Sequence, residues 1–311
     1  MNIKTTMAVI ALCAAGFARS KDTTDAAYLC AYMTGSDEKH LYFAVSEDGY
    51  LFDAINGGRP ILGASFDDRL VRDPHIFKDK DGVYRMVATV SWKNRPFTIW
   101  DSKDLVHWEN ERLVDVAPPD ASKTWAPELA LDEESGLYFV YWTAEQNNDW
   151  DTAAIWYATT RDFRKWSEPK VLYRAQGGIL DANIVKIDGI WNLVFRGTVD
   201  GKKGIHLAVS RSALGPYEYS HRITAHNMEG PFLFENRTDK GTYALMMDDY
   251  GRSAGFELFE TRDLKDWRRL TNEKPPYYND KVRFPKGIRH GAVIPISEAE
   301  LAALKKAFPG D

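Results

Sequence analysis

The 311-residue chain carries a net charge of −5, with 27% charged and 44% hydrophobic residues, which is typical of a globular protein with a full core. Its acidic balance and the lack of any basic stretch argue against nucleic-acid binding. The sequence contains no glycine-rich phosphate loop and no Cys/His cluster with metal-ligand spacing. Aromatic residues make up 13% of the chain, a share that favours strands.

The first residues have the pattern of a secretory signal peptide. Lys4 precedes an apolar run over residues 7–18 that is too short to span a bilayer. We therefore expect residues 1–18 to be a signal peptide of a secreted or periplasmic protein, and residues 19–311 to form a single domain. Cys30 is then the only cysteine of the mature chain, so we expect a buried small hydrophobe and no disulfide.

Two segment types recur in a fixed order along the rest of the chain. The first is a strand that is entered through a small residue, an apolar residue and an aromatic residue, at Ala26, Gly82, Gly136, Gly189 and Gly241. The second ends in a corner with a Ser/Thr-x-Asp pattern, at Asp48, Asp104, Asp162 and Asp263, with Ser212 as a degenerate copy. Asp in such turns bonds nearby backbone amides, so we interpret these residues as structural.

A third segment precedes the other two in each repeat. Aligning its copies places five residues in one column, at intervals of 48 to 61 residues: Asp73, Ala126, Asp181, Glu229 and His290. A unit of about 50 residues with about four short strands is typical of a propeller blade. The sequence therefore predicts an all-β protein folded as a five-bladed β-propeller.

The two ends of the chain are predicted to share one blade. The first repeat starts at residue 26 with the second strand of a blade, and the last repeat ends with a first strand over residues 292–296. Pairing these strands closes the ring and removes an open sheet edge. A short helix over residues 298–308 follows, and its Leu304 and Phe308 are placed to pack back on the propeller.

The column points to hydrolysis. The first strand of each blade lines the propeller axis, so Asp73, Asp181 and Glu229 should converge in one axial pocket. Hydrolysis of a glycosidic bond needs one ionised carboxylate that activates water and one protonated carboxyl that donates to the leaving oxygen. A third carboxylate can raise the pKa of the acid. The alternative is that Asp73 and Asp181 only cap turns at their strand entries.

As an ordered set, these motifs resemble glycoside hydrolase family 43 and the wider clan of five-bladed furanosidases. The resemblance is carried by Arg72-Asp73-Pro74, Trp125-Ala126-Pro127-Glu128, Leu180-Asp181-Ala182, Glu229-Gly230-Pro231 and Arg289-His290-Gly291. The N-terminal pattern also resembles secreted bacterial arabinosidases and galactofuranosidases.

The resemblance implies an inverting mechanism without a cofactor for the chemistry. Asp73 would be the general base, Asp181 would modulate the pKa of the acid and orient it, and Glu229 would be the general acid. Family members often hold a structural calcium or sodium ion on the axis, mostly through water, at a His in the position of His290.

Further residues are candidates for substrate binding. Trp125 either stacks on a sugar or packs at a blade junction, and Arg196 either reaches a sugar hydroxyl or pairs with a column carboxylate. Three residues lie two positions after column members and should face the axis more deeply, where they bind sugar or hold the pocket floor: His75, Glu128 and Asn183. His290 remains open between a core histidine, a substrate contact and an ion ligand.

Three functions remain open from the sequence. The first is an exo-acting α-L-arabinofuranosidase or β-D-galactofuranosidase that acts on polysaccharide side chains or oligosaccharides, and that we expect to be monomeric. The second is a β-xylosidase or endo-arabinanase with the same carboxylates, which depends on the loops at residues 147–151 and 277–286. The third is a non-catalytic carbohydrate-binding propeller, against which the presence of all three carboxylates argues.

Overall fold

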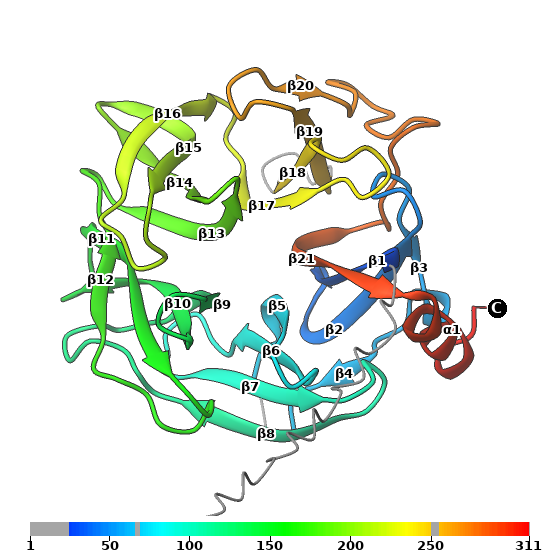
Figure 1. Ribbon diagram of the computed structural model, residues 1–311, viewed down its shortest axis with the longest axis horizontal. Helices are drawn as coiled ribbons and strands as arrows, with labels where there is room; N and C mark the ends of the chain where they lie inside the picture. Colours follow the sequence, from blue (N-terminus) through cyan, green and yellow to red (C-terminus); the bar gives the residue numbers. More distant parts are fainter. Residues whose placement is uncertain (1–24, 66–68, 250–254, 311) are drawn as a thin grey trace, which may run out of the picture.

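The computed structural model of the protein describes residues 25–65, 69–249 and 255–310, so the predicted signal peptide lies outside the described residues. The described strands form five antiparallel sheets arranged around a central axis (Figure 1). The predicted five-bladed β-propeller is thereby confirmed.

Four of the blades are each built from one continuous stretch of chain, with the innermost strand first. Their strands are β5 (Arg72–Lys78), β6 (Tyr84–Thr89), β7 (Phe97–Ser102) and β8 (Trp108–Val114); β9 (Trp125–Asp132), β10 (Leu137–Gln146), β11 (Asp149–Thr160) and β12 (Lys170–Tyr173); β13 (Ile179–Ile187), β14 (Ile190–Val199), β15 (Lys202–Ser210) and β16 (Glu218–Thr224); and β17 (Glu229–Glu235), β18 (Tyr243–Asp248), β19 (Phe256–Thr261) and β20 (Arg268–Arg269).

The fifth blade joins the two ends of the chain, as predicted. Its strand order is β21 (Ile288–Ser297), β1 (Asp25–Thr34), β2 (Asp37–Ser46) and β3 (Asp53–Ala54), and the short β4 (Leu62–Gly63) also pairs with β2. A single-turn 3-10 helix, η1 (Asn56–Gly58), follows β3. Since β21 pairs along almost the whole of β1, the last strand closes the ring at the axis (Figure 1).

The core lies between the blades, because both faces of each sheet are covered by a neighbour. In β10, Phe139 and Tyr141 pack toward the blade of β13 to β16, whereas Val140 and Trp142 pack toward the blade of β5 to β8. Successive side chains of a strand point to opposite faces, so a continuous apolar run serves two interfaces. Cys30 is a fully buried free thiol in the same kind of environment, as predicted.

The Asp corners are structural, as predicted. Asp104 Oδ1 accepts the amides of Val106 at 3.0 Å and His107 at 2.8 Å, and Asp263 accepts the amides of Lys265 and Asp266, both at 2.9 Å. These bonds hold the turn into the outermost strand of each of these two blades.

The predicted C-terminal helix is confirmed as α1 (Glu298–Ala307). It begins with a capping box between Ser297 and Glu300, and its buried Leu304 packs on the cluster formed with β1 and β6. Phe308 packs against the same cluster. Within the described part of the chain, no helix has the length and apolarity that crossing a membrane would require.

Candidate active site

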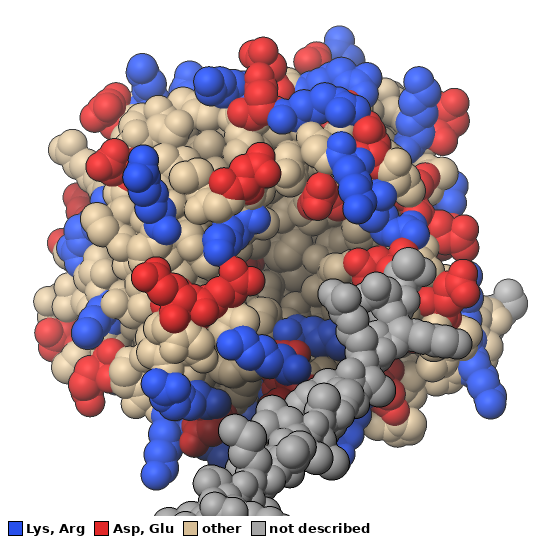
Figure 2. Space-filling view, in the orientation of Figure 1, with Lys and Arg blue, Asp and Glu red and all other residues tan. Residues whose placement is uncertain are grey.

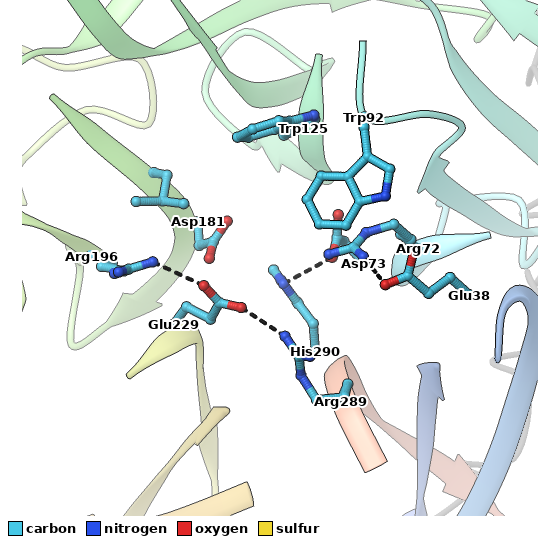
Figure 3. Close-up of a pocket in the computed structure, with 11 residues that line it drawn as sticks. Glu38, Arg72, Asp73, Trp92, Trp125, Asp181, Arg196, Glu229, Arg289 and His290 are labelled. Atoms are coloured by element: carbon cyan, nitrogen blue, oxygen red, sulfur yellow. Dashed lines mark hydrogen bonds and ion pairs between the residues drawn. The ribbon is translucent and has the colours of Figure 1, made fainter. Parts of the chain in front are cut away.

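A cavity of about 350 Å³ lies at the end of the axis where the inner strands begin (Figure 3). Its size is within the usual range for small-molecule sites. Every blade contributes to its wall, and the lining residues are Glu38, Arg72, Asp73, Trp92, Trp125, Leu180, Asp181, Arg196, Glu229, Arg289 and His290. Figure 2 views the molecule from the opposite end of the axis, where the inner strands end, and shows the central hollow there with charged side chains around it.

A bulge at the start of four inner strands aims side chains into this cavity. At the bulge, Asp73, Ala126, Asp181 and Gly230 have φ angles of 52°, 47°, 51° and 54°. Pairing with the second strand shifts register at the same points. A positive φ is uncommon outside glycine, and bulges next to active sites re-aim side chains. The backbone thus turns Asp73 and Asp181 toward the axis.

The bulge corrects the predicted alignment of Glu229. The sequence column placed Glu229 level with Asp73 and Asp181, but the residue with the bulge conformation is Gly230. Glu229 instead occupies the preceding position, which Arg72 and Leu180 occupy in other blades. Each of these three residues pairs with the second strand just before the register shift. Glu229 still lines the cavity, as do Arg72, Trp125 and Leu180 from the same position in other blades.

On the second strand, one residue pairs with this preceding position. Its side chain determines which hydrogen bond links one blade to the next. In two blades this residue is Thr89 and Thr143, whose hydroxyls accept a bulge amide of the next blade at 2.8 and 3.1 Å. In the third blade it is Arg196, and a guanidinium has no acceptor. The Gly230 amide therefore donates to Asp181 Oδ2, at 3.0 Å. This bond orients the Asp181 carboxylate.

Two arginines hold the carboxyl of Glu229. Arg196 Nη1 lies 2.9 Å from Oε2, and Arg289 Nη2 lies 2.8 Å from Oε1 (Figure 3). Arg289 is in turn bound through Nε by Asp248, a fully buried residue of β18 that also accepts the His290 amide at 3.3 Å. The Glu229 carboxyl is therefore fixed from the blades on both sides.

Gly230 is favoured at its position by the backbone conformation and required there by the lack of space. Its φ is positive, and a Cβ there would lie 2.9 Å from Cγ of His290. We expect Gly230→Ala to lower the free energy of unfolding by about 1–2 kcal/mol for the backbone conformation alone, and further for the clash. Because His290 must shift, kcat should fall as well.

Denaturant unfolding and initial rates measure both effects. Gly241→Ala is the matched control, because Gly241 has a φ of +77° and open space where its Cβ would lie. The difference between the two variants isolates the contact with His290. Equal losses of stability and full activity in both would contradict this account.

Asp73 and His290 form a buried ion pair across the axis. Asp73 Oδ1 lies 3.0 Å from Nδ1 of His290, and both residues are more than nine-tenths buried. Burial opposes both charges, but the imidazolium holds the pKa of Asp73 well below its usual range, and Asp73 and Asp181 raise the pKa of His290 to about 10. Asp73 is therefore ionised and His290 is protonated at neutral pH.

Glu229 has the opposite shift. Burial, together with the negative charges of Asp181 and Asp248, raises the pKa of Glu229 to about 7, against the opposing charges of His290 and Arg196. Burial also raises the pKa of Asp181, with Asp73 adding to the shift and His290 opposing it. The cavity thus holds one carboxylate kept ionised and one carboxyl whose raised pKa of about 7 lets it carry a proton near neutral pH, an arrangement typical of acid–base catalysis.

Six of the nine predicted site residues line the cavity: Asp73, Asp181, Glu229, Trp125, Arg196 and His290. The other three, His75, Glu128 and Asn183, do not line it. Their prediction as substrate contacts is therefore corrected. They follow the bulge and therefore lie beneath the cavity. Holding the pocket floor was the alternative role that the sequence analysis gave them.

A buried polar layer forms this floor. Glu128 accepts hydrogen bonds from the Tyr141 hydroxyl and from Asn183 Nδ2, the latter at 3.0 Å. His75 Nδ1 and Asn183 Oδ1 each accept an amide from the inner strand of the next blade, at 3.3 and 2.9 Å. Burial raises the pKa of Glu128 to about 7 and lowers that of His75 to about 3. The layer ties the inner strands together below the site.

The sequence reasoning missed five lining residues: Glu38, Arg72, Trp92, Leu180 and Arg289. Arg72 and Arg289 stand directly before column residues, so their place in the repeat could have identified them. Glu38, which pairs with Arg72, comes from the β1–β2 hairpin, where a charged turn gives no signal. Trp92 lies between β6 and β7 with the Arg72 guanidinium 3.9 Å from the centre of its ring (Figure 3).

The residues around His290 do not fit a directly bound metal ion. A protonated imidazole has no free lone pair, and the Nδ1 atom of His290 already faces Asp73. Within residues 25–65, 69–249 and 255–310, no group of three His, Cys, Asp or Glu side chains is placed to hold a metal. The water-mediated ion stays a prediction, and no step of the reaction is derived from it.

Comparison with known proteins decides the family. A family model described as "Probable glycosyl hydrolase domain", and related to glycoside hydrolase family 43, matches residues 24–302. The chain belongs to this family. The predicted resemblance to glycoside hydrolase family 43 is thereby confirmed.

Individual relatives of this family 43-related protein are distant. An α-L-arabinofuranosidase of Bifidobacterium longum subsp. longum is 22% identical over 87% of this chain, which spans only about a third (33%) of that longer relative. Two solved structures from Bacteroides thetaiotaomicron share the fold. One is an endo-arabinase (TM-score 0.58, 16% identity, 84% of this chain and 93% of that chain), and the other is an endo-1,4-β-xylanase (TM-score 0.59, 11% identity, 80% and 92%).

Proposed function

We propose that this glycoside hydrolase is secreted, inverts the anomeric configuration, and removes terminal furanose residues, α-L-arabinofuranose or β-D-galactofuranose, from polysaccharide side chains or oligosaccharides. The observation that carries the proposal is the cavity in which the pKa values of Asp73 and Glu229 are shifted in opposite directions. Two carboxyl groups with separated pKa values are what acid–base hydrolysis of a glycoside needs.

In this mechanism each carboxyl has one role. The ionised Asp73 removes a proton from water, which attacks the anomeric carbon from the face opposite the leaving group. Glu229 donates its proton to the leaving oxygen. One of its two contacts with arginine must open so that this carboxyl oxygen can reach the substrate. Asp181, oriented by the Gly230 amide, keeps the pKa of Glu229 raised. Asp73 takes up the proton from water, so the next turnover requires exchange with solvent.

The charges of the cavity favour a neutral sugar. Arg72 is paired with Glu38 and Arg289 with the buried Asp248, so both arginines stay balanced when Glu229 is protonated. A uronic acid would need a cation to balance its carboxylate in this buried site. The small volume, with a floor of buried side chains, supports removal of one terminal unit. The choice of a furanose follows the sequence resemblance and the name of the arabinofuranosidase relative.

A panel of p-nitrophenyl glycosides tests the proposal. The panel comprises the α-L-arabinofuranoside, the β-D-galactofuranoside, the β-D-xyloside and the α-L-arabinopyranoside, with NMR detection of the first anomer formed. We expect turnover of one furanoside, with inversion. Preference for the xyloside would overturn the sugar assignment, and a retained configuration would overturn the mechanism.

The separated pKa values predict the dependence of activity on pH. Glu229 must be protonated, and its raised pKa of about 7 means that the active form is lost as pH rises through that value. Asp73 must be ionised, and its lowered pKa keeps it so throughout the neutral range. We therefore expect kcat/KM to be highest near about pH 5–6 and to fall about tenfold per pH unit well above pH 7.

Rates measured from pH 4 to 9 check this dependence, with stability controlled by reassay at the optimum after incubation at each pH. If kcat/KM instead rises through pH 7, the active form of the enzyme has Glu229 ionised, and Glu229 is not the general acid.

A further inference from the structure

Three tryptophans lie in a row from the cavity wall outward, with neighbouring rings inclined at 89° and 43° to one another. Trp92 and Trp125 line the cavity, and their ring centroids are 6.0 Å apart. Trp150 does not line it, but its ring centroid lies 6.3 Å from that of Trp125. Trp92 is 52% exposed and Trp150 is 39% exposed, which is unusual for the largest apolar side chain. The surface defined by these three residues is called the tryptophan platform below.

The platform is held in place by cations on its inner part. The Arg72 guanidinium lies 3.9 Å from the centre of the Trp92 ring, and Lys123 Nζ lies 4.4 Å from that of Trp125. Such cation–π contacts fix ring orientation. Arg72 is itself paired with Glu38, so the inner rings have little freedom.

The outer part is held by the loop that leads to Asp181. Trp150 lies at the tip of the β10–β11 hairpin, against Gly178 at the start of β13, where a Cβ would be 2.4 Å from the Trp150 carbonyl oxygen and 2.8 Å from Nε1. Only glycine fits this contact, and its φ of +78° favours glycine as well. An exposed ring that is already positioned costs little conformational entropy on binding.

The chemistry of such a surface suits the apolar faces of sugar rings. The C–H groups of a sugar carry a small positive charge, and the faces of tryptophan rings are negative, so stacking adds to the burial of apolar area. The platform begins in the cavity wall and runs outward, so a glycan with its terminal unit in the cavity would pass over it. Continuity with the cavity therefore favours the same glycan over an unrelated partner.

We propose that the tryptophan platform is a second carbohydrate-binding site, which takes the sugar units on the leaving side of the cleaved bond, with Trp150 binding a unit beyond the one next to that bond. This rests on the proposed function for the position of the terminal sugar. The substrate class is accordingly an oligosaccharide or a polysaccharide side chain, and small glycosides use only the inner part of the site.

Kinetics on two substrates of different length test the proposal. The probes are the methyl glycoside of the furanose that the aryl panel selects and a tetrasaccharide that ends in the same furanose, such as arabinotetraose. We expect Trp150→Ala to lower the ratio of kcat/KM on the tetrasaccharide to kcat/KM on the methyl glycoside about threefold to tenfold. Tyr219→Ala should keep the wild-type ratio, because Tyr219 is equally exposed, at 39%, but lies on the outer strand β16.

Binding without turnover separates this proposal from the proposed function. Arabinotetraose is titrated calorimetrically into Glu229→Gln and into Glu229→Gln/Trp150→Ala. Weaker binding by the double variant supports the platform even if the wild type hydrolyses none of the glycosides. Equal binding by both variants, an unchanged ratio in Trp150→Ala, or no binding to Glu229→Gln would overturn it.

Discussion

Glu229→Gln should lower kcat/KM on methyl and oligosaccharide furanosides by about 10²–10⁴-fold, because the amide cannot donate a proton to the leaving oxygen. The loss should be much smaller on a 2,4-dinitrophenyl furanoside, whose leaving phenolate needs little protonation. The remaining activity on that substrate should lose the fall above pH 7, since the group with the raised pKa is gone.

The matched control for this variant is Glu235→Gln, at the exposed end of the same strand, β17. Thermal unfolding of both variants separates chemistry from folding, because a glutamine leaves one of the two arginines at Glu229 without an acceptor. Equal losses on good and poor leaving groups would show that Glu229 binds substrate and does not act as the acid.

Asp73→Asn should lower kcat/KM by a similar factor, about 10²–10⁴-fold, for every leaving group. The water then has no base, and the His290 imidazolium loses the carboxylate 3.0 Å away that raises its pKa. Azide is an anion that attacks without losing a proton. Adding azide should therefore restore turnover of the dinitrophenyl furanoside and give a glycosyl azide with inverted configuration.

Two controls make this second result decisive. Asp81→Asn removes an exposed carboxylate from the β5–β6 turn of the same blade and should retain wild-type rates. NMR of the wild-type product separates a base from a nucleophile, because a nucleophilic Asp73 would give retention. If azide restores no turnover in a variant with the thermal stability of the wild type, Asp73 is not the general base.

The fold could be predicted from the sequence because it depends on local patterns that occur five times. Gly82, Gly136, Gly189 and Gly241 each open a strand, and the Asp corners close the turn into the outermost strand with bonds to amides two or three residues away. The shared blade followed from the position of residue 26 within the repeat. Such signals need no knowledge of the neighbouring blades.

The floor residues show where the same reasoning stopped. His75, Glu128 and Asn183 were placed on the axis by strand alternation, which is where they lie. Alternation alone could not tell which axial residues form the wall of the cavity and which form its floor. That division depends on the bulge, where two residues shift the pairing of the strand. Their actual partners are amides and hydroxyls of adjacent blades.

The sequence by itself determined the five-bladed propeller, its closure by β1 and β21, and the three carboxyl groups of the site. Only the tertiary structure decided that Glu229 lies one position before the bulge and that Glu38 belongs to the cavity. The reason is that the bulge is tied by hydrogen bonds between blades, such as those from Asp181 to Thr143 and from Gly230 to Asp181, which join residues 38 and 49 positions apart. Contacts at that separation leave no local pattern in the chain.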